Sequence, residues 1–210
     1  MKRTGFDTMS SFAYPFYTIL HPKDGFQEMK FNKKDSLVVN FVIVAAWLFV
    51  EVFYRVAMDF DMNPFVYTDV SLLRVAVITV MVYGMLCVSN WCFCTLLDGK
   101  GKLKEIFMVT AYALVPYIIV RFVTVLLSMV MLNDEQILLN YCVLLAQLWG
   151  FVMAFTGLSE IHEYGFKKTL LSLVLTAIGV IIMLFISLML IMLFQQVYKF
   201  VTTVAIELAY

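Results

Sequence analysis

Long apolar runs separated by short polar stretches make up most of the chain after residue 36. A helix needs about 20 mostly apolar residues to cross the hydrocarbon core of a bilayer. Five runs meet this requirement and predict membrane-spanning helices at about Leu37–Tyr54, Leu72–Leu97, Ile106–Leu132, Ile137–Gly157 and Leu170–Phe194. The predicted fold class is therefore all-α, a polytopic membrane helical bundle with five transmembrane helices.

The segment before the first run has a different pattern, because its apolar residues are spaced among polar ones and no stretch is long enough to span. Pro22 interrupts it, and proline breaks a helix from within. The pattern predicts one or two short amphipathic helices lying in the membrane interface. Their apolar residues are Phe12, Phe16, Ile19, Leu20, Phe26, Met29 and Phe31, and Lys30, Lys33 and Lys34 would lie at the headgroups.

These patterns divide the chain into three parts. Residues 1–35 form a cytoplasmic or interfacial amphipathic segment, and residues 36–195 form the five-helix membrane domain. Residues 196–210 are expected to be an extracytoplasmic tail. The tail has a mixed composition, so it either extends the fifth helix past the membrane or forms a separate helix on the outer surface.

Composition supports the bilayer as the solvent of this chain. Of 210 residues, 63% are hydrophobic and 14% are charged, whereas a soluble domain has about 45–50% apolar and about 25% charged residues. The formal net charge is zero, so the basic surface that binds nucleic acid is not expected.

The basic residues are distributed unevenly between the two sides of the predicted membrane domain. Six precede the first span, three lie between spans two and three, and two lie between spans four and five, which makes eleven of the fifteen. Lysine and arginine are enriched in cytoplasmic loops. We therefore expect a cell-membrane protein with a cytoplasmic N-terminus and, after five spans, an extracytoplasmic C-terminus.

The same loops are candidates for contacts with a partner or with lipid headgroups, although setting the topology is the simpler role for their lysines. The candidate residues are Lys100, Lys102 and Lys104 in the first loop and Glu160, His162, Lys167 and Lys168 in the second.

Charged residues inside the predicted spans form the second candidate site. At 1.5 Å per residue, Glu51 lies about 21 Å into the first span and Arg121 about 22 Å into the third. Glu51 and Arg121 are therefore expected to pair, with Arg55 and Arg74 completing one intramembrane polar cluster. Such a cluster is either a substrate or proton site, or a structural ion pair whose arginines extend toward the interface.

Pro116 lies within the third span, where proline removes a backbone hydrogen bond and bends the helix. The bend serves either packing or hinge motion. Catalytic motifs are not found: the residue four after His162 is Phe166, so HExxH fails, and P-loop and GxSxG sequences are missing. We expect no enzyme activity, no cofactor and no metal.

Three stretches together resemble the Yip1-domain family, particularly its bacterial members. They are YPFYTILHPKDGFQEMK near the N-terminus, DGKGKLKEIFMVTAYALVPYI at the start of the third span, and GLSEIHEYGFKKTLL after the fourth. The resemblance covers about residues 10 to 195 and implies five spans with a cytoplasmic N-terminus. Eukaryotic members resemble scaffolds that bind small GTPases through an acidic-tyrosine-glycine-proline stretch. This chain has Tyr14-Pro15 and Asp24-Gly25 instead, so GTPase binding is not carried over.

Many bacterial members of the family are encoded near carbohydrate ABC transporters, which suggests the kind of partner. The resemblance therefore implies a non-catalytic integral membrane accessory or scaffold protein that associates with another membrane complex, such as ABC transporter subunits. The alternative is a small solute transporter or channel that acts as a homo-oligomer and uses the Glu51 cluster. An intramembrane enzyme is the least favoured interpretation.

Overall fold

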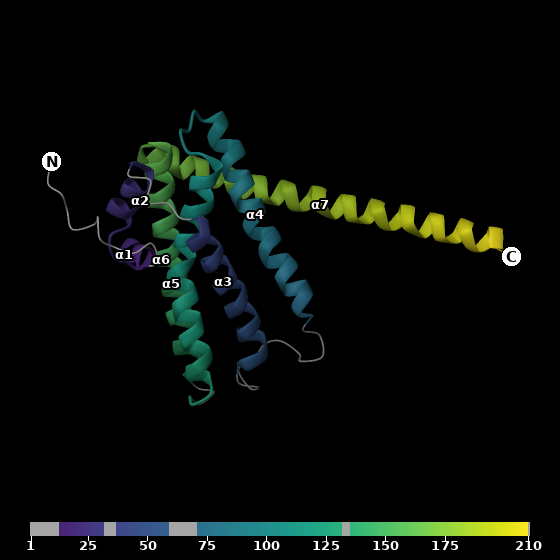
Figure 1. The fold of residues 1–210 in the computed structure, drawn as a ribbon, viewed down its shortest axis with the longest axis horizontal. Coiled ribbons are helices and arrows are strands. Elements are labelled where there is room, and N and C mark those ends of the chain that lie inside the picture. Colours follow the sequence, from purple (N-terminus) through teal and green to yellow (C-terminus); the bar gives the residue numbers. More distant parts are fainter. Residues whose placement is uncertain (1–12, 32–36, 59–70, 132–134, 210) are drawn as a thin grey trace.

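A computed structural model gives the fold and describes residues 13–31, 37–58, 71–131 and 135–209. Within these ranges the chain forms seven helices and no strand (Figure 1). The helices are α1 (Tyr14–Leu20), α2 (Pro22–Phe31), α3 (Leu37–Ala57), α4 (Leu72–Leu96), α5 (Leu103–Ser128), α6 (Gln136–His162) and α7 (Phe166–Ala209). The predicted interface residues Phe12, Lys33 and Lys34 lie outside the described residues, as do Lys2 and Arg3 among the counted basic residues.

The five-span prediction is confirmed, since α3 to α7 are long and apolar enough to cross a membrane. Their mean hydropathy ranges from 1.8 for α6 to 3.0 for α7. Each begins within a few residues of its predicted start. The all-α fold class is confirmed with them.

The N-terminal segment forms two short helices that meet at Pro22, as the sequence predicted. Pro22 is the first residue of α2, a position that requires no backbone N–H donor. Gly25 permits close packing of the two helices, because an added Cβ would lie 2.8 Å from Oγ1 of Thr18. Phe26 on α2 is fully buried and packs on Gly157 of α6. One side of this helix pair is therefore part of the bundle core.

α5 is the central helix of the bundle and contacts α1, α3, α4 and α6. Its fully buried residues include Ile106, Met108 and Tyr112, which form much of the main hydrophobic cluster. The helix continues through Pro116, which is itself buried. α6 approaches α5 closely at Gly150, where an added Cβ would lie 2.6 Å from the carbonyl oxygen of Ala113.

α7 is a single helix of 44 residues that packs on α4 near its start and then leaves the bundle (Figure 1). Ser89 donates to the Thr176 carbonyl oxygen at 2.8 Å, and Asn90 Nδ2 donates to the Thr176 hydroxyl at 2.9 Å. At 1.5 Å per residue α7 is about 66 Å long, roughly twice the thickness of a hydrocarbon core. The helix includes the predicted tail from residue 196 onward without a break.

Candidate functional site

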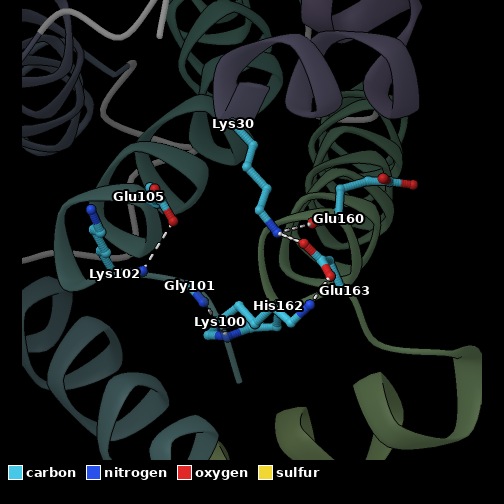
Figure 2. Close-up of polar contacts among 8 residues, drawn as sticks. All are labelled: Lys30, Lys100, Gly101, Lys102, Glu105, Glu160, His162 and Glu163. Atoms are coloured by element: carbon cyan, nitrogen blue, oxygen red, sulfur yellow. Dashed lines mark hydrogen bonds and ion pairs between the residues drawn. The ribbon is translucent and has the colours of Figure 1, made fainter. Parts of the chain in front are cut away.

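Three segments far apart in the sequence meet at one end of the bundle, which we call the basic end. They are the end of α2, the turn between α4 and α5, and the turn between α6 and α7 (Figure 2). Glu163 joins them: its Oε1 lies 2.7 Å from Nζ of Lys30, and its Oε2 pairs with Nζ of Lys100. Lys30 Nζ also donates to the Glu160 carbonyl oxygen at 3.4 Å. One carboxylate therefore links α2 and both turns.

The backbone explains how Glu163 reaches this position. It caps the C-terminus of α6 in the left-handed conformation, with φ of 57°. Such a residue ends a helix and turns the chain sharply. The Tyr164 N–H then bonds to the Ser159 carbonyl oxygen at 3.0 Å. Asp98 is also left-handed, with φ of 56°, but it follows Leu97, the C-cap residue of α4.

The imidazole of His162 fills the space between these two turns. Nδ1 accepts a hydrogen bond from the Gly101 N–H at 3.3 Å, so the neutral ring carries its proton on Nε2. An added Cβ on Gly101 would lie 2.8 Å from Cε1 of the ring, and Gly99 also borders the ring closely. The Gly-Lys-Gly turn therefore allows backbone packing against His162.

Tyr164 adds a second connection between the turns. Its hydroxyl donates to the carbonyl oxygens of Cys94 and Leu97 at the end of α4, at 3.0 and 3.2 Å. Burial raises the pKa of this phenol to about 12, so it remains a donor at neutral pH. The ring stacks on His162 with centroids 5.1 Å apart, and Nζ of Lys168 lies 4.8 Å from its centroid.

Electrostatics at the basic end favours the ionised form of Glu163. Hydrogen bonds from Lys100 and then Lys30 lower the pKa of this carboxyl group to about 2. The carboxylate is exposed, so water screens these attractions. Two lysines share one glutamate, which leaves the basic end cationic.

The remaining loop candidates surround this centre. Lys102, Lys104, Lys167 and Lys168 are exposed, and the Lys102 N–H donates to Glu105 Oε2 at 3.0 Å. Figure 2 shows the Glu160 side chain directed away from Lys30. All seven loop candidates lie at this end of the bundle, but the contacts of Lys30, Glu163 and Tyr164 that join its segments were not predicted. The sequence does mark Glu163 as a turn residue, since it lies between His162 and Gly165 in the loop after the fourth span.

The intramembrane candidates form a smaller cluster than predicted. Glu51 Oε2 lies 2.7 Å from Nη1 of Arg55, one helical turn along α3. Its Oε1 accepts a hydrogen bond from the Tyr117 hydroxyl of α5, also at 2.7 Å. Both carboxylate oxygens are therefore occupied by groups other than Arg121.

The predicted Glu51–Arg121 pair does not form among the described residues. The Arg121 guanidinium instead lies over the Tyr54 ring, 3.5 Å from its centroid. Arg74 is exposed at the first turn of α4, and no described side-chain contact joins it to the other three. Equal depth in the membrane does not fix the direction of a side chain around its helix, and Arg55 already lies on the same face of α3 as Glu51.

The apolar helices, their common core and the charged turns at one end define a polytopic helical membrane protein. The sequence profile described as the Yip1 domain matches residues 16–197. The chain therefore belongs to the Yip1 domain family, as the three motifs indicated. No curated protein and no solved structure matches the chain.

Proposed function

We propose that this chain is a non-catalytic membrane accessory or scaffold protein that docks on another membrane complex through its basic end. The observation that supports this is the joining of three segments by Glu163 while Lys102, Lys104 and Lys167 remain exposed. Segments held together in this way can bind without first losing conformational entropy. The exposed lysines favour a partner with an acidic surface.

The partner that the family resemblance suggests is a carbohydrate ABC transporter. In this proposal the chain lies in the cell membrane with its N-terminus and its basic end in the cytoplasm, and its C-terminus is extracytoplasmic. The basic end then faces the cytoplasmic subunits of the transporter. A fluorescent protein that matures only in the cytoplasm, fused after residue 210, should stay dark. Bright fluorescence would reject this orientation.

Affinity purification of the full chain in mild detergent tests the docking. We expect transporter subunits to copurify in a fixed ratio, and we expect the combined substitution Lys102→Glu and Lys167→Glu to remove them. Lys199→Glu is the control, because Lys199 is also exposed but lies near the far end of α7. Loss of the partner in the control as well would contradict a role for the basic end.

The alternative is a small solute transporter or channel that acts as a homo-oligomer. The partly buried Glu51–Arg55–Tyr117 cluster favours it, since ionisable residues inside membrane helices often mark substrate or ion sites. A homo-oligomer without other partners, with solute flux into liposomes that Glu51→Gln abolishes, would support this function over docking.

A further inference from the structure

One side of α6 is apolar except for two carboxamides. Asn140 and Gln147 are exposed and seven residues apart, a spacing that places them on the same side of the helix. Leu144 and Phe151 lie on this side as well and are 48% and 56% exposed. We call these four residues the amide stripe. Their spacing of i, i+4, i+7 and i+11 is that of a seam between two helices.

The other helices leave the amide stripe open. The adjoining side of α6, which includes Gly150, is buried against α5. Trp149 lies on the side opposite the stripe, and its Nε1 donates to the Ile19 carbonyl oxygen of α1 at 3.1 Å. Asn140 and Gln147 themselves make no hydrogen bond with any described residue. The stripe is therefore the side of α6 that remains available to another molecule.

Depth in the bilayer makes the Gln147 amide unfavourable without a partner. α6 has 27 residues, so it is about 40 Å long and exceeds the hydrocarbon core by about 10 Å. With α6 centred in the core, Gln147 lies about 3 Å from the middle of the bilayer and Asn140 about 14 Å from it. Lipid tails offer no hydrogen bonds. Gln147 therefore requires a polar group from outside the described helices, whereas Asn140 can also reach the interface.

The chemistry of the carboxamide selects that partner. Each amide both donates and accepts hydrogen bonds, so two identical amides can satisfy each other, whereas a charged group at this depth would carry its own cost of desolvation. Two copies of the chain inserted in the same bilayer have the same orientation. A two-fold axis along the membrane normal then sets their α6 helices parallel, and each residue near the axis faces its counterpart at the same depth.

We infer that α6 pairs in parallel with α6 of a second copy along the amide stripe, with carboxamide hydrogen bonds between the two Gln147 side chains and between the two Asn140 side chains. Pairing through α6 is compatible with either proposed function, because it uses neither the basic end nor Glu51. Its failure would therefore leave both of those proposals standing.

Förster resonance energy transfer in liposomes tests the pairing. The full chain carries a donor or an acceptor fluorophore at its C-terminus, and the protein-to-lipid ratio is varied. We expect transfer that saturates as for a dimer and that unlabelled protein removes. Gln147→Leu should raise the dissociation constant of the dimer about tenfold, through the loss of two interhelical hydrogen bonds. Asn140→Leu should raise it only about two- to threefold, because Asn140 has the interface as an alternative.

The matched control is Gln195→Leu, which makes the same change at an exposed position of α7. It should leave the dissociation constant within about twofold of wild type. Circular dichroism and a monodisperse elution profile identify the variants that are folded. Gln147→Leu should be among them, because Gln147 is exposed and makes no hydrogen bond within the described ranges.

Oxidative cross-linking locates the interface. Leu144→Cys places a thiol in the amide stripe, and residues that face each other across a parallel helix pair approach closely enough for a disulfide. We expect this variant to form a covalent dimer. Wild type is the control, because its exposed Cys92 and Cys142 lie outside the stripe and Cys142 is on the opposite side of α6. It should remain a monomer on denaturing gels under the same conditions.

Several results would overturn the inference. One is a full chain that stays monomeric at every protein-to-lipid ratio, including the case in which a different membrane protein copurifies and is lost in Gln147→Leu. Another is a dimer with the same dissociation constant in folded Gln147→Leu protein as in wild type, or one that Gln195→Leu weakens equally. Cross-linking of wild type as efficient as that of Leu144→Cys would place the contact on another face and would also reject the amide stripe.

Discussion

The partner of Glu51 can be identified by comparing two double-mutant cycles. One combines Glu51→Gln with Arg55→Leu, and the other combines Glu51→Gln with Arg121→Leu. Glutamine keeps the shape of Glu51 and can still accept from Tyr117, so the cycles report mainly the loss of charge. Other contacts of each arginine cancel within its cycle, provided that the two substitutions do not disturb each other elsewhere.

The structure sets the expected magnitudes. The Glu51 and Arg55 side chains are 15% and 22% exposed, and their atoms approach to 2.7 Å. A hydrogen bond between charged groups contributes about 1.5–3 kcal/mol, and partial exposure places this pair at about 2 kcal/mol. Arg121 makes no ion pair with Glu51, so its coupling should stay below about 0.5 kcal/mol. The single substitution Arg121→Leu should lower the free energy of unfolding by about 1 kcal/mol, because it removes the contact of the guanidinium with the Tyr54 ring.

Reversible unfolding of the protein by SDS in mixed micelles, followed by tryptophan fluorescence, measures all six free energies of unfolding. The expected order of coupling energies is Glu51–Arg55 well above Glu51–Arg121. If the Glu51–Arg121 coupling equals or exceeds the other, the description of this cluster is wrong and the pairing predicted from equal depth is right.

Three further predictions concern packing and pH. Phe26→Ala should cost about 3–4 kcal/mol of unfolding free energy in the same assay, against less than about 0.5 for the exposed Phe31→Ala. Gly150→Ala should destabilise by about 1–3 kcal/mol because its Cβ meets a backbone carbonyl, whereas Gly84→Ala has open space and should be neutral or stabilising. The pKa of Glu163 is lowered from 4.5 to about 2, so its ionised form stabilises the folded state fully above about pH 4.5. The difference in unfolding free energy between wild type and Glu163→Gln should therefore disappear as the pH falls toward 2.

The spans could be predicted from sequence because length and hydropathy are local properties. Pro22 likewise marks its own helix boundary. The end of α7 could not be predicted in this way, because Gln195, Gln196 and Lys199 reduce hydropathy without opposing helix formation. Hydropathy therefore locates the part that can enter lipid, whereas helix propensity decides how far the helix continues.

The pairing of side chains was the part that sequence could not determine. Lys30 and Glu163 are 133 positions apart, and only the packing of α2 on α6 brings them together. Glu51 shows the same limit within the membrane, since its depth was predicted but its direction was not. The residue of α5 that contacts Glu51 is Tyr117, one helical turn before Arg121.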